Sequence, residues 1–294
     1  MSIPAEDDEI EASRAPLMEH LIELRSRLII CAVAVAIGFV ICFVFSTNIY
    51  LFLLGPYERA GEIFAVTKGV GPNHGPFDLV LALLGLKTAA HAPSPINMVF
   101  TAPLEFFFTK VKLAGFGALV LVFPVLAWQL YRFVAPGLYK RERGAFLPFL
   151  AASPVLFLMG AALVYFVMLP FVLWFSLNQQ ILGAGAVTVQ MMSKVSDYLD
   201  LVTTLLLAFG LCFQLPVILA LLGMAGIVSS QALASGRRYA VLAVFAVAMI
   251  ITPPDPFSMM SLGIPGVLLY EISIWCVWLI ERRRKREDAA AEAT

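Results

Sequence analysis

Residues 28–46 read LIICAVAVAIGFVICFVFS, a run of 19 residues without a charged side chain. A helix needs roughly 20 apolar residues to cross the hydrocarbon core of a bilayer, which is about 30 Å thick. Inside that core each backbone polar group must find its partner within the protein, and an α-helix provides this. The run therefore predicts a transmembrane helix near the start of the chain.

Similar runs recur along the chain. The whole sequence is 61% hydrophobic and 14% charged, whereas soluble domains are about half apolar and a quarter charged. Prolines inside the runs predict kinked helices and a curved bundle. We therefore expect an all-α, polytopic integral membrane protein, one domain over residues 1–294 with six transmembrane helices. The expected spans are residues 28–46, 106–130, 147–169, 198–222, 239–252 and 262–280.

The fifth run is the shortest. Residues 239–252 cover about 21 Å as a helix, and the following Pro253-Pro254-Asp255-Pro256 cannot continue one. Either the fifth and sixth runs form a short helical hairpin, or they form one re-entrant element that never crosses. The positions of the basic residues favour the hairpin, and hence six crossings with short fifth and sixth helices.

Cytoplasmic loops of membrane proteins are enriched in Lys and Arg. Six crossings with residues 1–27 and the tail 281–294 in the cytoplasm place fourteen of the 20 basic residues inside. These are Arg14, Arg25, Arg27, Arg132, Lys140, Arg141, Arg143, Arg237, Arg238, Arg282, Arg283, Arg284, Lys285 and Arg286. The charge pattern thus predicts both termini on the cytoplasmic side and an extended outer loop over residues 47–105.

Sequence patterns typical of an enzyme are missing. The four cysteines lie in apolar runs without metal-ligand spacing, and neither G-x-S-x-G nor H-E-x-x-H occurs. We expect no catalysis, no metal and no cofactor, and membrane lipid rather than nucleic acid around the protein.

Ionisable and polar groups at membrane depth are functional candidates. Glu271 lies in the sixth run, Asp255 at its outer turn, and Gln214 deep in the fourth span. Glu271 and Gln214 at the bilayer midplane would suit an ion-coupled secondary transporter, although the sequence shows no repeated halves. The alternatives are hydrogen bonds between helices for Glu271 and Gln214, and a helix cap for Asp255.

The inner face offers a second group of candidates. Glu19, Glu23 and Arg27 share one helical stripe, which predicts a ladder of i,i+4 ion pairs. In the first inner loop, Glu142 lies among four cations and near Phe133. A carboxylate among cations can be their counter-ion. Alternatively, the two acidic positions could bind guanidinium groups, because arginine offers a carboxylate a rigid fork that lysine lacks.

Three motifs in order resemble the TatC family, the polytopic core of the twin-arginine protein translocase. They are His20-Leu21-Ile22-Glu23-Leu24-Arg25, then Phe133-Val134-Ala135-Pro136-Gly137-Leu138-Tyr139 with Glu142-Arg143, then Thr252-Pro253-Pro254-Asp255. The resemblance covers residues 17–280. It implies a receptor in the bacterial inner membrane that binds twin-arginine signal peptides of folded precursors. It also implies a multimeric complex with single-span subunits of the TatA and TatB type, driven by the proton motive force.

Matching the family motifs residue by residue implies signal-peptide binding by Glu23, Arg25, Phe133, Glu142 and Arg143. Two further positions match functionally important family residues, Pro56 and Asp255. Gln214 departs from the family pattern, because many members carry a glutamate there. Glutamine can form hydrogen bonds but cannot titrate, which argues against a proton-dependent role at this position.

Overall fold

The computed structural model describes residues 5–68, 98–99, 101–134, 143–180, 194–251 and 256–292. Within these ranges the chain is helical, apart from short turns and one isolated bridge between Val99 and Lys194. The elements are α1 (Ala5–Val44), α2 (Ser46–Lys68), α4 (Glu105–Val134), α5 (Arg143–Leu163), η2 (Val164–Met168), α6 (Leu169–Asn178), α7 (Val195–Cys212), α8 (Leu215–Met224), α9 (Ser230–Ser235), α10 (Arg237–Ile251) and α11 (Pro256–Glu292). The predicted all-α class is confirmed.

Five helical stretches are long and apolar enough to cross a membrane. They are Leu21–Val44, Glu105–Leu130, Ala151–Asn178, Val195–Met224 and Met259–Arg283. Each contains most or all of one predicted span. The predicted fifth span corresponds to α10, whose 15 residues extend about 22 Å. The protein is therefore a multi-pass membrane protein in which α10 is the short element.

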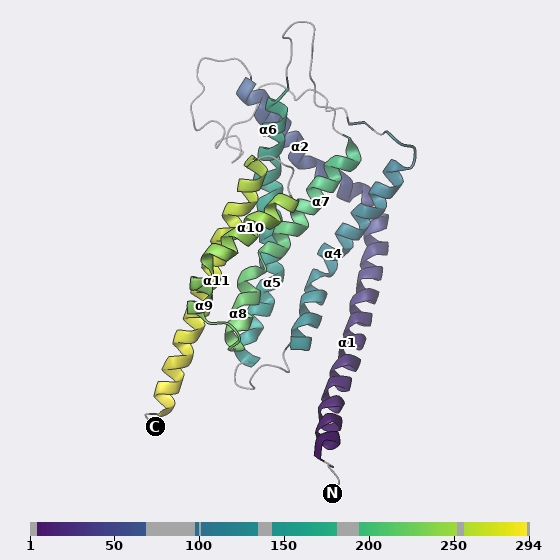
Figure 1. Ribbon diagram of the computed structural model, residues 1–294. Helices are drawn as coiled ribbons and strands as arrows, with labels where there is room; N and C mark the ends of the chain where they lie inside the picture. The colour runs from purple at the N-terminus through teal and green to yellow at the C-terminus, as the bar shows by residue number, and fades with distance from the viewer. Residues whose placement is uncertain are drawn as a thin grey trace.

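The helices form an elongated bundle with both termini at one end (Figure 1). Here α1 packs on α4, α5 on α7, and α8 and α10 on α11. At the opposite end, α2 runs obliquely and packs against α6. The main core lies among α2, α4 and the helices from α5 to α7, with Val164, Leu169, Val202 and Phe209 fully or almost fully buried.

Small residues allow the central helices to approach closely. A Cβ atom at Gly160 of α5 would lie 2.8 Å from the backbone oxygen of Phe209, and one at Gly210 of α7 would lie 2.5 Å from the Phe157 ring. Small residues at such crossings are typical of membrane helices, because lipid supplies little drive to bury side chains and packing decides association.

Proline positions break or bend several elements, as predicted. Pro124 and Pro265 lie inside α4 and α11. Pro216 follows a break between α7 and α8 at Phe213 and Gln214, and Pro170 lies in the first turn of α6, directly after the π-helical turn η2.

The outer connection differs from the prediction. Residues 47–105 were expected to form an extended loop, yet their first third is the helix α2. Gly55, Pro56 and four charged residues interrupt the apolar pattern of this helix. Its buried face is defined by packing against α6, which is distant in sequence. At the C-terminal end, α11 continues to Glu292 through arginine, glutamate and alanine, which favour helix.

Candidate functional site

A groove lies between α1 and α4, toward the end of the bundle that holds both termini. Its volume is about 390 Å³, and it is lined by Ile22, Glu23, Ser26, Arg27, Ile30, Gln129 and Arg132. Apolar side chains and side chains of both charges therefore meet in one open cavity. Glu23, one of the predicted site residues, is among them.

Within this groove, Glu23 and Arg27 form the predicted i,i+4 pair. The Arg27 Nε donates to Glu23 Oε1 at 3.1 Å, and a terminal nitrogen of Arg27 donates to the same oxygen. The other terminal nitrogen donates to Gln129 Oε1 of α4 at 3.4 Å. Arg27 is 15% exposed and Glu23 is 34% exposed. The pair thus ties α1 to α4 while its carboxylate remains accessible from the groove.

The other predicted signal-binding residues take different places. Arg25 is exposed and does not line the groove. Phe133 lies in the last turn of α4, directly after Arg132 of the groove, and Arg143 is the first residue of α5. Their side chains, and all of Glu142, lie outside the described residues. The backbone therefore brings Phe133 to the groove's edge, while the position of Glu142 remains a prediction.

Gln214 is buried at the break between α7 and α8. Its side chain forms a closed pair with Ser153 of α5. The Ser153 hydroxyl donates to Gln214 Oε1 at 2.7 Å, and Gln214 Nε2 donates to the Ser153 carbonyl at 2.9 Å. These contacts are the helix-to-helix hydrogen bonds that the sequence analysis offered as one alternative. The arrangement holds a neutral amide in the core.

Glu271 of α11 forms an ion pair with Arg237, the first residue of α10. Its two oxygens accept from Arg237 Nε at 2.9 Å and from a terminal nitrogen at 3.0 Å. The pair is partly exposed, at 52% for Arg237 and 39% for Glu271. Glu271 thus fixes the start of α10 on α11. Asp255, the neighbouring candidate, lies outside the described residues.

Pro56, the remaining candidate, is fully buried inside α2. It lies at the opposite end of the bundle from the groove, where α2 meets the helices of the core. The structure therefore separates the predicted residues into a group around Glu23, toward the end that holds both termini, and Pro56 at the opposite end.

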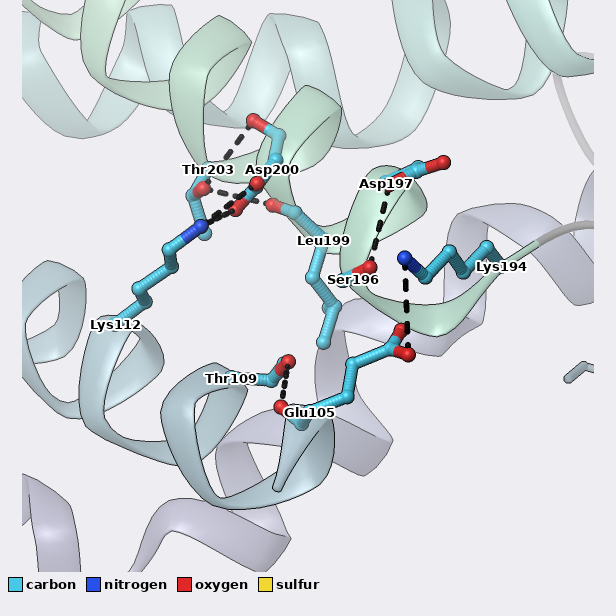
Figure 2. Close-up of polar contacts among 9 residues, drawn as sticks. All are labelled: Glu105, Thr109, Lys112, Lys194, Ser196, Asp197, Leu199, Asp200 and Thr203. Atoms are coloured by element: carbon cyan, nitrogen blue, oxygen red, sulfur yellow. Dashed lines mark hydrogen bonds and ion pairs between the residues drawn. The ribbon is translucent and has the colours of Figure 1, made fainter. Parts of the chain in front are cut away.

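A polar network that was not predicted from the sequence joins α4 and α7 at the end of the bundle opposite the termini (Figure 2). Glu105 Oε2 accepts from the Thr101 backbone N–H at 2.9 Å and lies 3.7 Å from Lys194 Nζ. About two helical turns after Glu105 in α4, Lys112 Nζ donates to both carboxylate oxygens of Asp200, at 2.9 and 3.1 Å. The partners are far apart in sequence. The sequence could have suggested the pairing in one way only. The predicted spans 106–130 and 198–222 each have one end on the predicted outer side, so charged residues near those ends could meet.

Chemically, the arrangement is suited to recognition. Among the side chains that the structure describes, no group of three or more His, Cys, Asp or Glu residues could hold a metal ion. The groove instead presents a carboxylate, two guanidinium groups and apolar side chains near one end of a membrane bundle. Such a surface suits a flexible peptide that carries both charge and apolar residues.

Known proteins support a specific family. The family model described as "Sec-independent protein translocase protein (TatC)" matches residues 19–265. The TatC protein of Magnetococcus marinus is 40% identical over 280 residues, covering 95% of this chain and 90% of that protein. The Escherichia coli K12 protein is 34% identical over 274 residues, covering 93% and 92%.

Solved structures agree with the sequence relatives. A crystal structure of the twin-arginine translocase receptor TatC superimposes with a TM-score of 0.67 at 31% identity, covering 88% of this chain and 98% of that one. A second structure, of the same receptor in the detergent DDM, gives 0.67 at 32% identity. The chain therefore belongs to the TatC family of Sec-independent protein translocase subunits, which are components of a membrane transport complex.

Proposed function

We propose that this protein is the signal-peptide receptor of a twin-arginine translocase, and that the groove between α1 and α4 receives the arginine pair. The observation that carries the proposal is the position of Glu23. It is a partly exposed carboxylate that lines an open groove of about 390 Å³ together with apolar side chains. The groove could therefore accept both the guanidinium groups and the neighbouring residues of a signal peptide.

The pairing of Glu23 with Arg27 suggests how binding would occur. The Nε of Arg27 donates a hydrogen bond to this carboxylate, so Glu23 is placed to accept from a guanidinium group. A peptide arginine would share the carboxylate or take the place of Arg27, which keeps its second contact to Gln129. A hydrogen bond between charged groups contributes about 1.5–3 kcal/mol. Part of that gain is offset by the contact that Arg27 gives up, so we expect a second acidic site, Glu142, to contribute as well.

In this proposal Phe133, Arg143 and Arg25 complete the recognition site. Phe133 follows the groove residue Arg132 at the end of α4, and we expect its ring to contact the apolar part of the peptide. The distribution of basic residues supports a bacterial inner membrane orientation with both termini in the cytoplasm. On this orientation the groove faces the compartment where precursors fold. Single-span subunits of the TatA and TatB type would then join a multimeric complex, with transport driven by the proton motive force.

The test compares two peptides and one variant. Purified protein in nanodiscs would be titrated with a twin-arginine signal peptide and with the same peptide carrying two lysines. We expect the lysine peptide to bind at least tenfold more weakly, because lysine lacks the fork. Glu142→Gln should weaken the arginine peptide and leave the lysine peptide almost unchanged. Equal binding of the two peptides would overturn the proposal.

Photocrosslinking gives the location. A photoreactive residue at Phe133 should capture a twin-arginine precursor, and one at Glu62 on the outer helix α2 should not. Capture at Glu62 alone would contradict the inner groove as the binding site. The alternative carrier function gains no support from the contacts at membrane depth, because Gln214 is closed on Ser153 and Glu271 is paired with Arg237.

A further inference from the structure

Pro56 interrupts the hydrogen bonding of α2. It lies inside the helix Ser46–Lys68, where a proline has no N–H to donate to the carbonyl four residues earlier. That carbonyl belongs to Phe52. A backbone carbonyl that is removed from water without a partner costs free energy comparable to a lost hydrogen bond. The protein must therefore either leave this group unsatisfied or bring a donor from elsewhere.

Two tyrosines from other helices supply donors at this point. The Tyr165 hydroxyl of η2 donates to the Phe52 carbonyl at 2.6 Å. The Tyr198 hydroxyl of α7 donates to the next carbonyl, that of Leu53, at 2.7 Å. Both carbonyls that accept from these tyrosines therefore lie in the turn of α2 that directly precedes Pro56.

The surrounding sequence shapes this contact. Tyr165 lies in the five-residue π-helical turn Val164–Met168, and such turns shift the direction of side chains relative to a regular helix. Its ring stacks on Phe52 with centroids 4.6 Å apart. Gly55 leaves room for the hydroxyl, because a Cβ atom there would lie 2.5 Å from the Tyr165 oxygen. Tyr198 packs edge-on against Tyr57 at 5.3 Å and is 4% exposed.

We propose that Tyr165 and Tyr198 are positioning residues that fix α2 across the outer end of the bundle: the Tyr165 hydroxyl replaces the helical donor that Pro56 removes from the Phe52 carbonyl, and the Tyr198 hydroxyl binds the adjacent Leu53 carbonyl. This inference goes beyond signal-peptide recognition, because it concerns the opposite end of the molecule and does not depend on the inner groove. It also gives Pro56 a defined role. The proline leaves the Phe52 carbonyl without its helical donor, and Tyr165 supplies another one.

The consequence concerns the placement of α2. Leu53, Tyr57 and Ala60 of this helix are buried in the main core, and α2 packs along α6. Without the tyrosine hydroxyls, the disturbed turn would have to straighten or open, and these buried residues would shift with it. The two donors therefore link the direction of α2 to the helix pair formed by η2 and α7.

The experiment is a double-mutant cycle in the full-length protein, read by thermal unfolding in detergent and by amide hydrogen exchange of α2. Tyr165→Phe should lower Tm by about 3 °C and speed exchange in α2, because one carbonyl loses its donor. In a Pro56→Ala background the restored backbone N–H donates to the Phe52 carbonyl. Tyr165→Phe should then lower Tm by less than half as much as in the original protein. Tyr239→Phe, an exposed tyrosine on α10, is the matched control and should shift Tm by less than about 1 °C.

A second cycle covers the case in which Pro56→Ala does not fold. Gly55→Ala should destabilise the protein, since its Cβ would collide with the Tyr165 oxygen, and Tyr165→Phe should relieve much of that loss. The proposal would be overturned if Tyr165→Phe changed Tm by the same amount with and without Pro56→Ala, or with and without Gly55→Ala. A Tyr165→Phe effect no larger than that of Tyr239→Phe would also overturn it. Binding of a twin-arginine peptide should be unchanged in all these variants, which separates this result from the proposed function.

Discussion

The pair formed by α1 and α4 differs sharply from the centre of the bundle formed by α5, α7 and α8. In the most apolar stretch of α1, 11% of the residues are buried inside the protein, against 50% in the stretch that covers α7 and α8. At the centre, Gly160 and Gly210 let backbones approach closely and Gln214 is closed on Ser153. Beside α1 there is instead an open groove with a partly exposed ion pair.

This difference indicates a division of roles. The centre has close packing and a closed polar pair, which makes it a rigid support. The arm formed by α1 and α4 leaves most of its apolar residues uncovered by the rest of the protein, and the candidate site lies in this arm. Precise recognition requires a rigid scaffold behind an accessible surface. Substitutions at the centre should therefore change stability, and substitutions in the groove should change binding.

The largest expected effect is at the close approach of α5 and α7. Gly160→Val would place side-chain atoms against the Phe209 backbone oxygen, so the helices must separate. We expect a loss of about 3 kcal/mol and a clear fall in Tm. Gly115→Val in α4 is the control, because nothing lies within 4 Å of its Cβ position. Similar losses for both variants would show that the centre is no more tightly packed than the arm.

A smaller effect, on binding rather than folding, is expected in the groove. Glu23→Gln removes the charge that receives the peptide arginine in the proposed function, while the positive charge of Arg27 remains. The affinity for a twin-arginine peptide should fall about tenfold with little change in Tm. Glu62→Gln, at an exposed position on α2, should leave affinity unchanged. If Glu23→Gln lowered Tm strongly and affinity not at all, Glu23 would be a structural residue only.

An intermediate test of the centre concerns its polar pair. Ser153→Ala leaves Gln214 Oε1 without its donor, and we expect a loss of about 1 kcal/mol, as for other hydrogen bonds between membrane helices. Ser176→Ala is the control, since its hydroxyl donates to a carbonyl of its own helix, that of Val172. Thermal unfolding of both variants in the same detergent measures the difference. Equal shifts would mean that the contact between helices adds nothing specific.

The smallest effect is expected at the outer ion pair of Lys112 and Asp200. Both side chains are at least half exposed, at 63% and 50%, and exposed ion pairs contribute less than about 1 kcal/mol. Lys112→Gln should lower Tm slightly at low salt, and the difference should vanish near 1 M NaCl. A large loss that persists in high salt would indicate that this pair belongs to the rigid part of the molecule.

The sequence predicted features that depend on local or one-dimensional patterns. Apolar runs located the long helices because the bilayer requires them, and the stripe of Glu23 and Arg27 was correct because a helix brings positions i and i+4 together. Helix α2 was missed because its apolar face meets a partner more than 100 residues away in sequence. The contacts of Tyr165, Tyr198 and Glu105 were missed for the same reason. The role of Glu142 stays a prediction.

Helix α11 has a mechanical property that follows from its length. It contains 37 residues, and beyond its contacts with α8 and α10 the Glu281 carboxylate accepts from the backbone N–H and the hydroxyl of Ser230 at the start of α9. From Glu281 to Glu292 the helix extends about 16 Å. A change of tilt at Glu281 is therefore amplified along this last stretch. A fluorescent reporter fused to the C-terminus would report movements of α11 relative to α9.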